Sequence, residues 1–171
     1  MSDSPATLTA PVLDAGSLLA HWQGHRSLTR RMIEAFPEDE LFTFNAGGMR
    51  PFAQLAAEML QMIAPTMKGA LEDVWEAGGY GAPAPTTKAG LLAAWDEADG
   101  VLAESFPKIP AERFGEEANA FGLWRAPVIT TLLYLIDNEV HHRGQGYVYL
   151  RMLGIEPPLF YQRSTLTAGR V

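Results

Sequence analysis

The chain of 171 residues contains no cysteine. This absence excludes disulfides, zinc ribbons and cysteine nucleophiles, so a bound metal would need histidine, carboxylate or amide ligands. No stretch approaches the roughly 18 uncharged apolar residues that span a bilayer. Residues 1–13 also lack the basic start and apolar segment of a signal peptide. We therefore expect a cytoplasmic protein with no membrane contact.

Basic side chains are scarce as well. Thirteen lysines and arginines stand against twenty acidic residues, which gives a net charge of −7. No basic patch suited to phosphates is evident, so nucleic acid is not an expected partner. Apolar residues make up 47% of the chain, enough for one globular domain with a substantial core.

Apolar residues recur at helical spacing in four segments, which predicts an all-α four-helix bundle. The predicted helices run from Asp14 or Ser17 to Phe36, from Pro51 to Trp75 with a bend at Pro65, from Thr86 or Thr87 to Phe106, and from Pro127 to Gly154. We expect a flexible segment at 1–13, the bundle at 14–158 and a tail at 159–171.

The connections between these helices differ in character. Residues 37–49 mix acids, aromatics and glycines, which predicts a loop, and residues 78–85 form the clearest linker. Residues 111–124 have no firm period. They predict one long irregular crossover before the last helix, with a short turn of helix or a strand as an open alternative.

A polar stripe follows the otherwise apolar last helix. Its members are spaced four, four, three and four residues apart: Tyr134, Asn138, His142, Gln145 and Tyr149. An unpaired buried polar group costs about 1 to 3 kcal/mol, so the alignment predicts partners, water or a ligand along this face. Asn138 and His142 can approach one ion, although a lone histidine there is more often a hydrogen-bonded core or surface residue.

The string NEVHHRGQ at 138–145, followed by GYVYLRMLGIEPP, resembles the last-helix signature of the DinB-like family. That signature is usually close to H-x-x-H-H-R-G-Q with a following YLR-LG-PP segment. The resemblance is strong over 138–158 and weaker over 15–158. It implies a four-helix bundle, a homodimer, and a metal site with one ligand from the second helix and two from the last.

Histidine usually fills all three family positions, with one glutamate in some branches. The resemblance places the paired ligands at Asn138 and His142, and the alignment of RPFAQLAAEM places the third at Glu58. An amide oxygen is a poor ligand for zinc or nickel, so the expected metal is weakly bound or absent. An empty site should leave Glu58 protonated, or hydrogen-bonded to Asn138 or His142.

Other polar residues have weaker assignments. His141 lies about 100° around the helix from His142, so it is expected to flank the pocket, with Tyr134 and Gln145 as further candidates. Glu139 and Arg143 are predicted to pair along the helix surface, with an anionic substrate as an alternative partner of Arg143. His21 and His25 could supply replacement ligands, but a surface or seam role is preferred.

Two hypotheses of function follow. Members of the family include metal-dependent thiol transferases and isomerases, so the resemblance implies an enzyme whose metal activates a thiol or water. The two replaced histidines favour a second hypothesis, in which the protein is a metal-free binder of a small ligand or a stress-associated interaction protein. The sequence identifies no substrate.

Overall fold

The computed structural model describes residues 13–76 and 83–163. Most of the predicted flexible segment 1–13, much of the predicted linker 78–85 and the tail beyond Arg163 therefore lie outside the described residues. No helix among the residues described is both long enough and apolar enough to cross a membrane.

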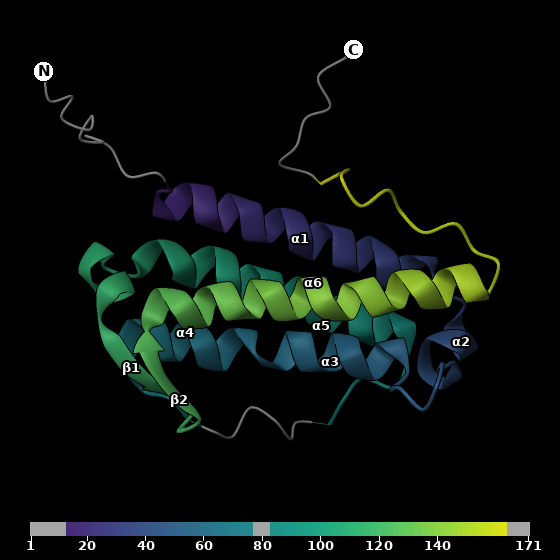
Figure 1. Cartoon of the computed structure of the whole chain (residues 1–171), viewed down its shortest axis with the longest axis horizontal. Coiled ribbons are helices and arrows are strands. Elements are labelled where there is room, and N and C mark those ends of the chain that lie inside the picture. The colour runs from purple at the N-terminus through teal and green to yellow at the C-terminus, as the bar shows by residue number, and fades with distance from the viewer. Residues whose placement is uncertain (1–12, 77–82, 164–171) are drawn as a thin grey trace, which may run out of the picture.

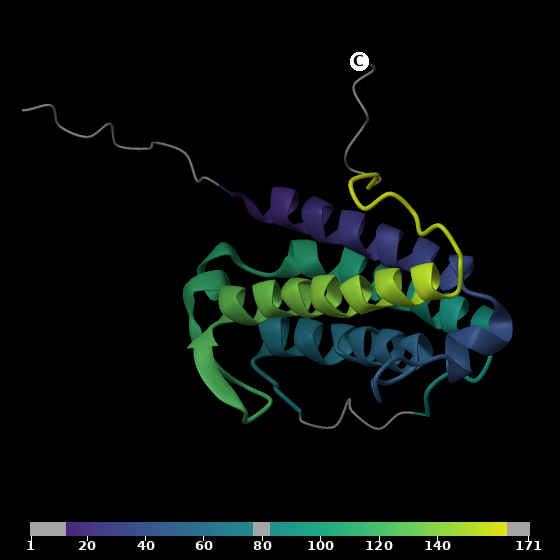
Figure 2. The ribbon, with the colours of Figure 1, turned by 45° about the vertical axis from the view of Figure 1, so that its right-hand side comes forward.

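Four helical lines form the body of the molecule (Figure 1). They are α1 (Ala15–Ala35), α3 (Phe52–Gln61) continued by α4 (Ile63–Glu72), α5 (Lys88–Ser105) and α6 (Val128–Met152). The α1 helix packs against α5 and α6, and the α3–α4 line packs against the same two helices from the other side (Figure 2). The predicted all-α four-helix bundle is confirmed.

The helix ends follow ordinary capping chemistry. The Asp14 carboxylate accepts from the backbone of Ser17 at 2.7 Å, and the Thr87 hydroxyl accepts from the backbone of Gly90 at 3.1 Å. These contacts decide between the alternative caps of the first and third predicted helices. At the end of α6, Gly154 takes the left-handed conformation with φ 75°, as its position predicts.

The second predicted helix is broken, but not where we expected. The break lies at Met62, while Pro65 is the third residue of α4. The amide of residue 65 would bond to the carbonyl of residue 61, and proline has no such amide, so the helix restarts two residues earlier, at Ile63. The helix also ends at Glu72 and not at Trp75, because Asp73 adopts φ 58°.

Short elements occupy the connections. The prediction of a loop over 37–49 is wrong in part, because α2 (Glu38–Thr43) forms there with three acidic residues in its first turn and Leu41 buried. The connection from α5 to α6, which includes the predicted crossover 111–124, contains two 3₁₀ turns, η2 (Phe106–Lys108) and η3 (Ala111–Gly115), and an antiparallel hairpin of β1 (Glu117–Ala120) and β2 (Trp124–Pro127). Both open alternatives for this crossover are therefore realised.

Two apolar clusters fill the bundle. One lies toward the hairpin end, and its largest members include Trp22, Ile63, Leu102, Phe106 and Leu132. The other lies toward α2, and its largest members include Phe36, Phe52, Trp95, Tyr149 and Leu150. They are joined by the partly buried Leu60, which packs against both.

The α3 and α6 helices approach closely at Gly146. A Cβ atom at this position would lie 2.4 Å from the ring of Phe52, which is fully buried. The φ of Gly146 is not in the left-handed region, so its backbone conformation does not call for glycine. Glycine is required here by the close contact of the two helices. This contact fixes the distance between the helices one turn beyond His142.

Charged side chains are buried between α1 and α6. Glu139 and Arg143 are 2% and 6% exposed, and their side chains approach to 3.5 Å. The predicted pairing is present, but its expected place on the helix surface is wrong. Sequence spacing shows only that two residues share a side of a helix, and here that side faces α1.

Candidate functional site

Three predicted site residues meet between α3 and α6. Oε1 of Glu58 lies 3.1 Å from Nε2 of His142 and accepts from Nδ2 of Asn138 at 3.3 Å. Glu58 comes from the middle of α3, while Asn138 and His142 lie one turn apart on α6. The structure thus places a carboxylate, an amide and an imidazole at one point, as their spacing and the resemblance predict.

A fourth residue, Arg50, completes the surroundings of the carboxylate. Its Nη2 atom lies 2.6 Å from Oε2 of Glu58. Burial alone raises the pKa of the Glu58 carboxyl, but hydrogen bonds from Arg50 and His142 outweigh it and hold this pKa below its ordinary value. The expectation that Glu58 is protonated is wrong, because Arg50 supplies a positive charge. The hydrogen bonds expected as the alternative are present.

Two further contacts orient the polar groups. Nδ1 of His142 lies 2.9 Å from Oε1 of Gln145, so the predicted pocket residue Gln145 holds the imidazole from behind. Nδ2 of Asn138 also reaches Sδ of Met62 at 3.5 Å. In contrast, Oδ1 of Asn138 is buried and has no hydrogen-bond partner among the described residues. An unpaired buried acceptor is costly, so this oxygen is suited to a donor from outside the protein.

A cavity of about 280 Å³ opens beside these groups. Its lining residues come from α3 and α6: Glu58, Tyr134, Asp137, Asn138, His141 and His142. Tyr134 forms an exposed wall whose ring packs edge-on against Trp124, with centroids 5.2 Å apart. His141 is exposed and touches the His142 ring from outside, as predicted for a flanking residue.

Comparison with known proteins agrees with this architecture. A model of the DinB family matches residues 125–169, which include most of β2 and all of α6. A DinB-like protein from Bacillus cereus ATCC 10987 superposes with a TM-score of 0.71 at 21% identity, covering 85% of this chain and 97% of that one. The chain is therefore similar to the DinB family in its last helix and has the fold of DinB-like proteins.

A DinB-like protein from Bacillus subtilis has the same fold as this chain. Its TM-score is 0.70 at 20% identity, with 86% of this chain and 98% of the other covered. Identities this low show the shared fold alone. No curated protein matches the sequence.

The donor set of this cavity does not suit a transition metal. Zinc and nickel favour imidazole and, less strongly, carboxylate. Within the ranges 13–76 and 83–163, no group of three His, Cys, Asp or Glu residues is arranged to hold a metal ion. Of the three converging residues only Glu58 and His142 are strong ligands, and the second oxygen of Glu58 is engaged by Arg50. These residues do not fit a tightly held zinc or nickel ion.

The other histidine pair of the protein lies elsewhere. His21 and His25 approach each other on α1, with Nε2 atoms 3.1 Å apart, and His25 contacts Arg143 on the side of α6 away from Glu58. They take the preferred seam role and do not line the Glu58 cavity.

Arg50 and Asp137 are the site residues that sequence reasoning missed. Arg50 lies in the connection before α3, where no periodicity indicates its direction. Its position eight residues before Glu58 gave no signal either. Asp137 precedes Asn138 on α6 and was not singled out, although adjacency to a proposed ligand was a usable signal.

Proposed function

We propose that this DinB-like protein binds a small polar ligand in the Glu58 cavity without a tightly held transition metal. One observation carries the proposal: both oxygens of the Glu58 carboxylate already have protein donors. Oε2 faces Arg50 at 2.6 Å, and Oε1 faces His142 and Asn138 at 3.1 and 3.3 Å. The carboxylate is therefore neutralised and hydrogen-bonded by the chain itself, and needs no cation to justify its burial.

The groups that face the cavity favour a ligand with N–H or O–H donors. Oδ1 of Asn138 is an acceptor that no described residue satisfies, Glu58 is ionised, and Asp137 contributes a second carboxylate to the lining. Tyr134 gives one apolar wall. A small amine or amino alcohol would match this set, since its donors would pair with the carboxylate and amide oxygens of these residues.

Ethanolammonium and acetate make a matched pair of probes of opposite hydrogen-bonding character. We expect ethanolammonium to shift the NMR signals of the His142 ring saturably, and acetate to leave them unchanged at equal ionic strength. Glu58→Gln should abolish the shift because it replaces a carboxylate oxygen, which only accepts, with an amide group that donates. Asp39→Asn, a neutralisation in the distant α2 helix, should preserve it. Saturable binding of acetate would refute the preference for donors.

A metal-dependent enzyme is the second candidate, as the resemblance to thiol transferases and isomerases implies. It is favoured by the convergence of Glu58, Asn138 and His142, since Oε1 of Glu58 lies 3.3 and 3.1 Å from the nearest polar atoms of the other two. The ligands of a tetrahedral zinc ion are separated by about 3.3 Å, given metal–ligand bonds of about 2.0 Å. A bound metal would supply Lewis acidity toward a thiol or water.

Metal titration separates the two candidates. The protein should be purified without a histidine tag, stripped with chelator and titrated with zinc and with nickel against a chromophoric competitor. We expect dissociation constants no tighter than the micromolar range, because only one imidazole and one carboxylate converge on a common point. His142→Ala should weaken this binding further. Stoichiometric uptake at nanomolar metal, lost in His142→Ala, would overturn the proposal in favour of the enzyme.

A further inference from the structure

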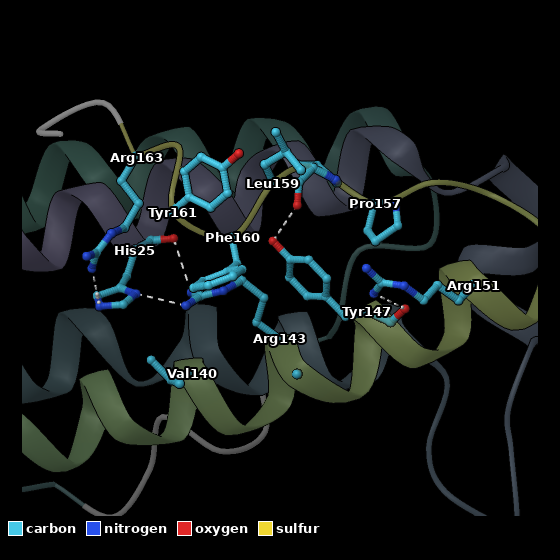
Figure 3. A pocket seen from close by; sticks show the side chains of 12 residues that line it. His25, Val140, Arg143, Tyr147, Arg151, Pro157, Leu159, Phe160, Tyr161 and Arg163 are labelled. Carbon is cyan, nitrogen blue, oxygen red and sulfur yellow. Dashed lines mark hydrogen bonds between the residues drawn. The ribbon is translucent and has the colours of Figure 1, made fainter. Parts of the chain in front are cut away.

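Figure 3 shows a second and larger pocket, lined by residues of α6 other than those that face Glu58. We call it the tail pocket, because the segment 157–163 that follows α6 folds back over α1 and α6 to form its roof. Its volume is about 500 Å³, and it shares no lining residue with the Glu58 cavity. The hydroxyl of Tyr147 donates to the carbonyl of Pro158 at 2.7 Å and fastens this segment to α6.

The polar end of the tail pocket has more donors than acceptors. Nη2 of Arg143 lies 2.8 Å from Nδ1 of His25, and Nη1 of Arg163 lies 2.8 Å from Nε2 of the same ring (Figure 3). A neutral imidazole accepts at one nitrogen only, because the other carries a proton. One of the two guanidinium groups therefore points a donor at an N–H group.

The surrounding charges do not resolve this conflict. Among the described residues, the lining of the tail pocket contains Arg143, Arg151 and Arg163 and no aspartate or glutamate, although the whole chain carries a net charge of −7. Arg143 is 6% exposed, and the carboxylate of Glu139 lies 3.5 Å from it on the buried side. Nε of Arg163 is buried, and no residue in the described part of the chain accepts its hydrogen.

The histidine at the centre responds to the same charges. Burial, followed by Arg143, Arg163 and His21, lowers the pKa of His25 to about 3. Neutral His25 thus separates two cations at the cost of one unsatisfied donor. A negative group placed beside the two guanidinium groups would supply an acceptor for Nε of Arg163 and the negative charge that the pocket lining lacks.

The remainder of the tail pocket is apolar and partly aromatic. Its walls are formed by Val140, Tyr147, Pro157, Leu159, Phe160 and Tyr161. Phe160 and Tyr161 are 71% and 55% exposed, which leaves the roof accessible from solvent. A bare inorganic ion would leave these walls unused, whereas an organic acid would cover them. The volume lies in the range that small-molecule sites occupy.

We propose that the tail pocket binds a small aromatic carboxylate, whose carboxylate group is held by Arg143 and Arg163 and whose ring lies against the apolar walls. Arginine presents a planar fork that matches a carboxylate with two parallel hydrogen bonds, which makes these two side chains suitable for this class of ligand. This site is independent of the ligand proposed for the Glu58 cavity.

Benzoate is the probe, with benzyl alcohol as its neutral counterpart. Isothermal titration of the full chain at constant ionic strength should give saturable binding of benzoate and none of benzyl alcohol. Arg163→Gln should weaken benzoate binding about tenfold, or about 1.4 kcal/mol. Arg163 packs outside both apolar clusters, so this variant should retain the circular dichroism of the parent.

Two control variants show whether the loss of affinity is specific to the tail pocket. Arg125→Gln removes the same charge from an exposed position on β2 and should leave the affinity unchanged. Glu58→Gln should also leave it unchanged, because Glu58 does not line the tail pocket. The proposal would be overturned by an equal loss in Arg125→Gln, by a loss in Glu58→Gln, by inorganic phosphate binding as tightly as benzoate, or by no saturable binding.

Discussion

Glu139→Ala is expected to lower the free energy of unfolding by about 3–5 kcal/mol, the effect of removing one partner from a buried ionic group. Glu139 is 2% exposed and lies between two buried arginines, Arg26 and Arg143. Its Oε1 atom accepts from the Thr29 hydroxyl at 2.5 Å. Burial raises the pKa of Glu139, while Arg26, Thr29 and Arg143 act in the opposite direction.

Arg26 shows why the loss should be large. Its guanidinium lies 3.7 Å above the ring centroid of Trp95, yet its two terminal nitrogens are buried without hydrogen-bond partners in the described structure. Asp99 pairs with its Nε atom. Removing Glu139 would leave Arg26 and Arg143 without the carboxylate that both approach. Their charges would then be buried without this partner, which is costly.

Urea unfolding followed by circular dichroism measures this effect, with Glu104→Ala as the matched control. Glu104 is also a helical glutamate with a basic partner, Lys108 at 2.9 Å, but its side chain is 77% exposed. Its loss should change the stability by no more than about 0.5 kcal/mol. Equal losses in the free energy of unfolding would show that the buried ion pairs of Glu139 stabilise the protein no more than an exposed pair does.

Asn138→His is expected to raise zinc affinity at least about hundredfold. The substitution would give a set of Glu58, His142 and a new imidazole on the adjacent turn, which is the two-histidine and one-glutamate set of several catalytic zinc sites. The cavity of about 280 Å³ beside Asn138 leaves room for the larger ring. Zinc would also have to displace Arg50 from Glu58, and Arg50 is 48% exposed and can turn to solvent.

Competition with a chromophoric chelator measures this gain, and Val148→His is its control. Val148 is 52% exposed on the same helix, so a histidine there adds a ligand without joining the cavity. Only the substitution at 138 should bind zinc tightly, and the added Glu58→Gln should reverse the gain. A folded Asn138→His protein without increased affinity would contradict the shared geometry of these three positions.

The body of the fold was predictable because its helices are long and their apolar periods are regular. The α6 helix, for example, begins and ends where Pro127 and Gly154 indicate. The α2 helix has six residues, too few to show a period against its acidic composition. The hairpin depends on left-handed backbone at Phe121 and Gly122, and no pattern marks a phenylalanine for that conformation.

The candidate site was predictable in its position and not in its charge. Helical spacing and the resemblance brought Glu58, Asn138 and His142 together correctly. The protonation of Glu58 could not be inferred, because it depends on Arg50, which reaches the site from a connection without periodicity. The burial of Glu139 and Arg143 likewise depends on side chains of α1 such as Thr29, which contacts both. The spacing of residues along α6 cannot predict contacts with another helix.

Gly146 has a consequence for how this bundle can evolve. With no room for a Cβ beside Phe52, the two backbones that carry Glu58 and His142 are held at a fixed separation, whatever side chains those positions bear. One base change converts an asparagine codon into a histidine codon. A lineage can therefore exchange one kind of pocket chemistry for another at a single position, while the scaffold that carries it stays as it is.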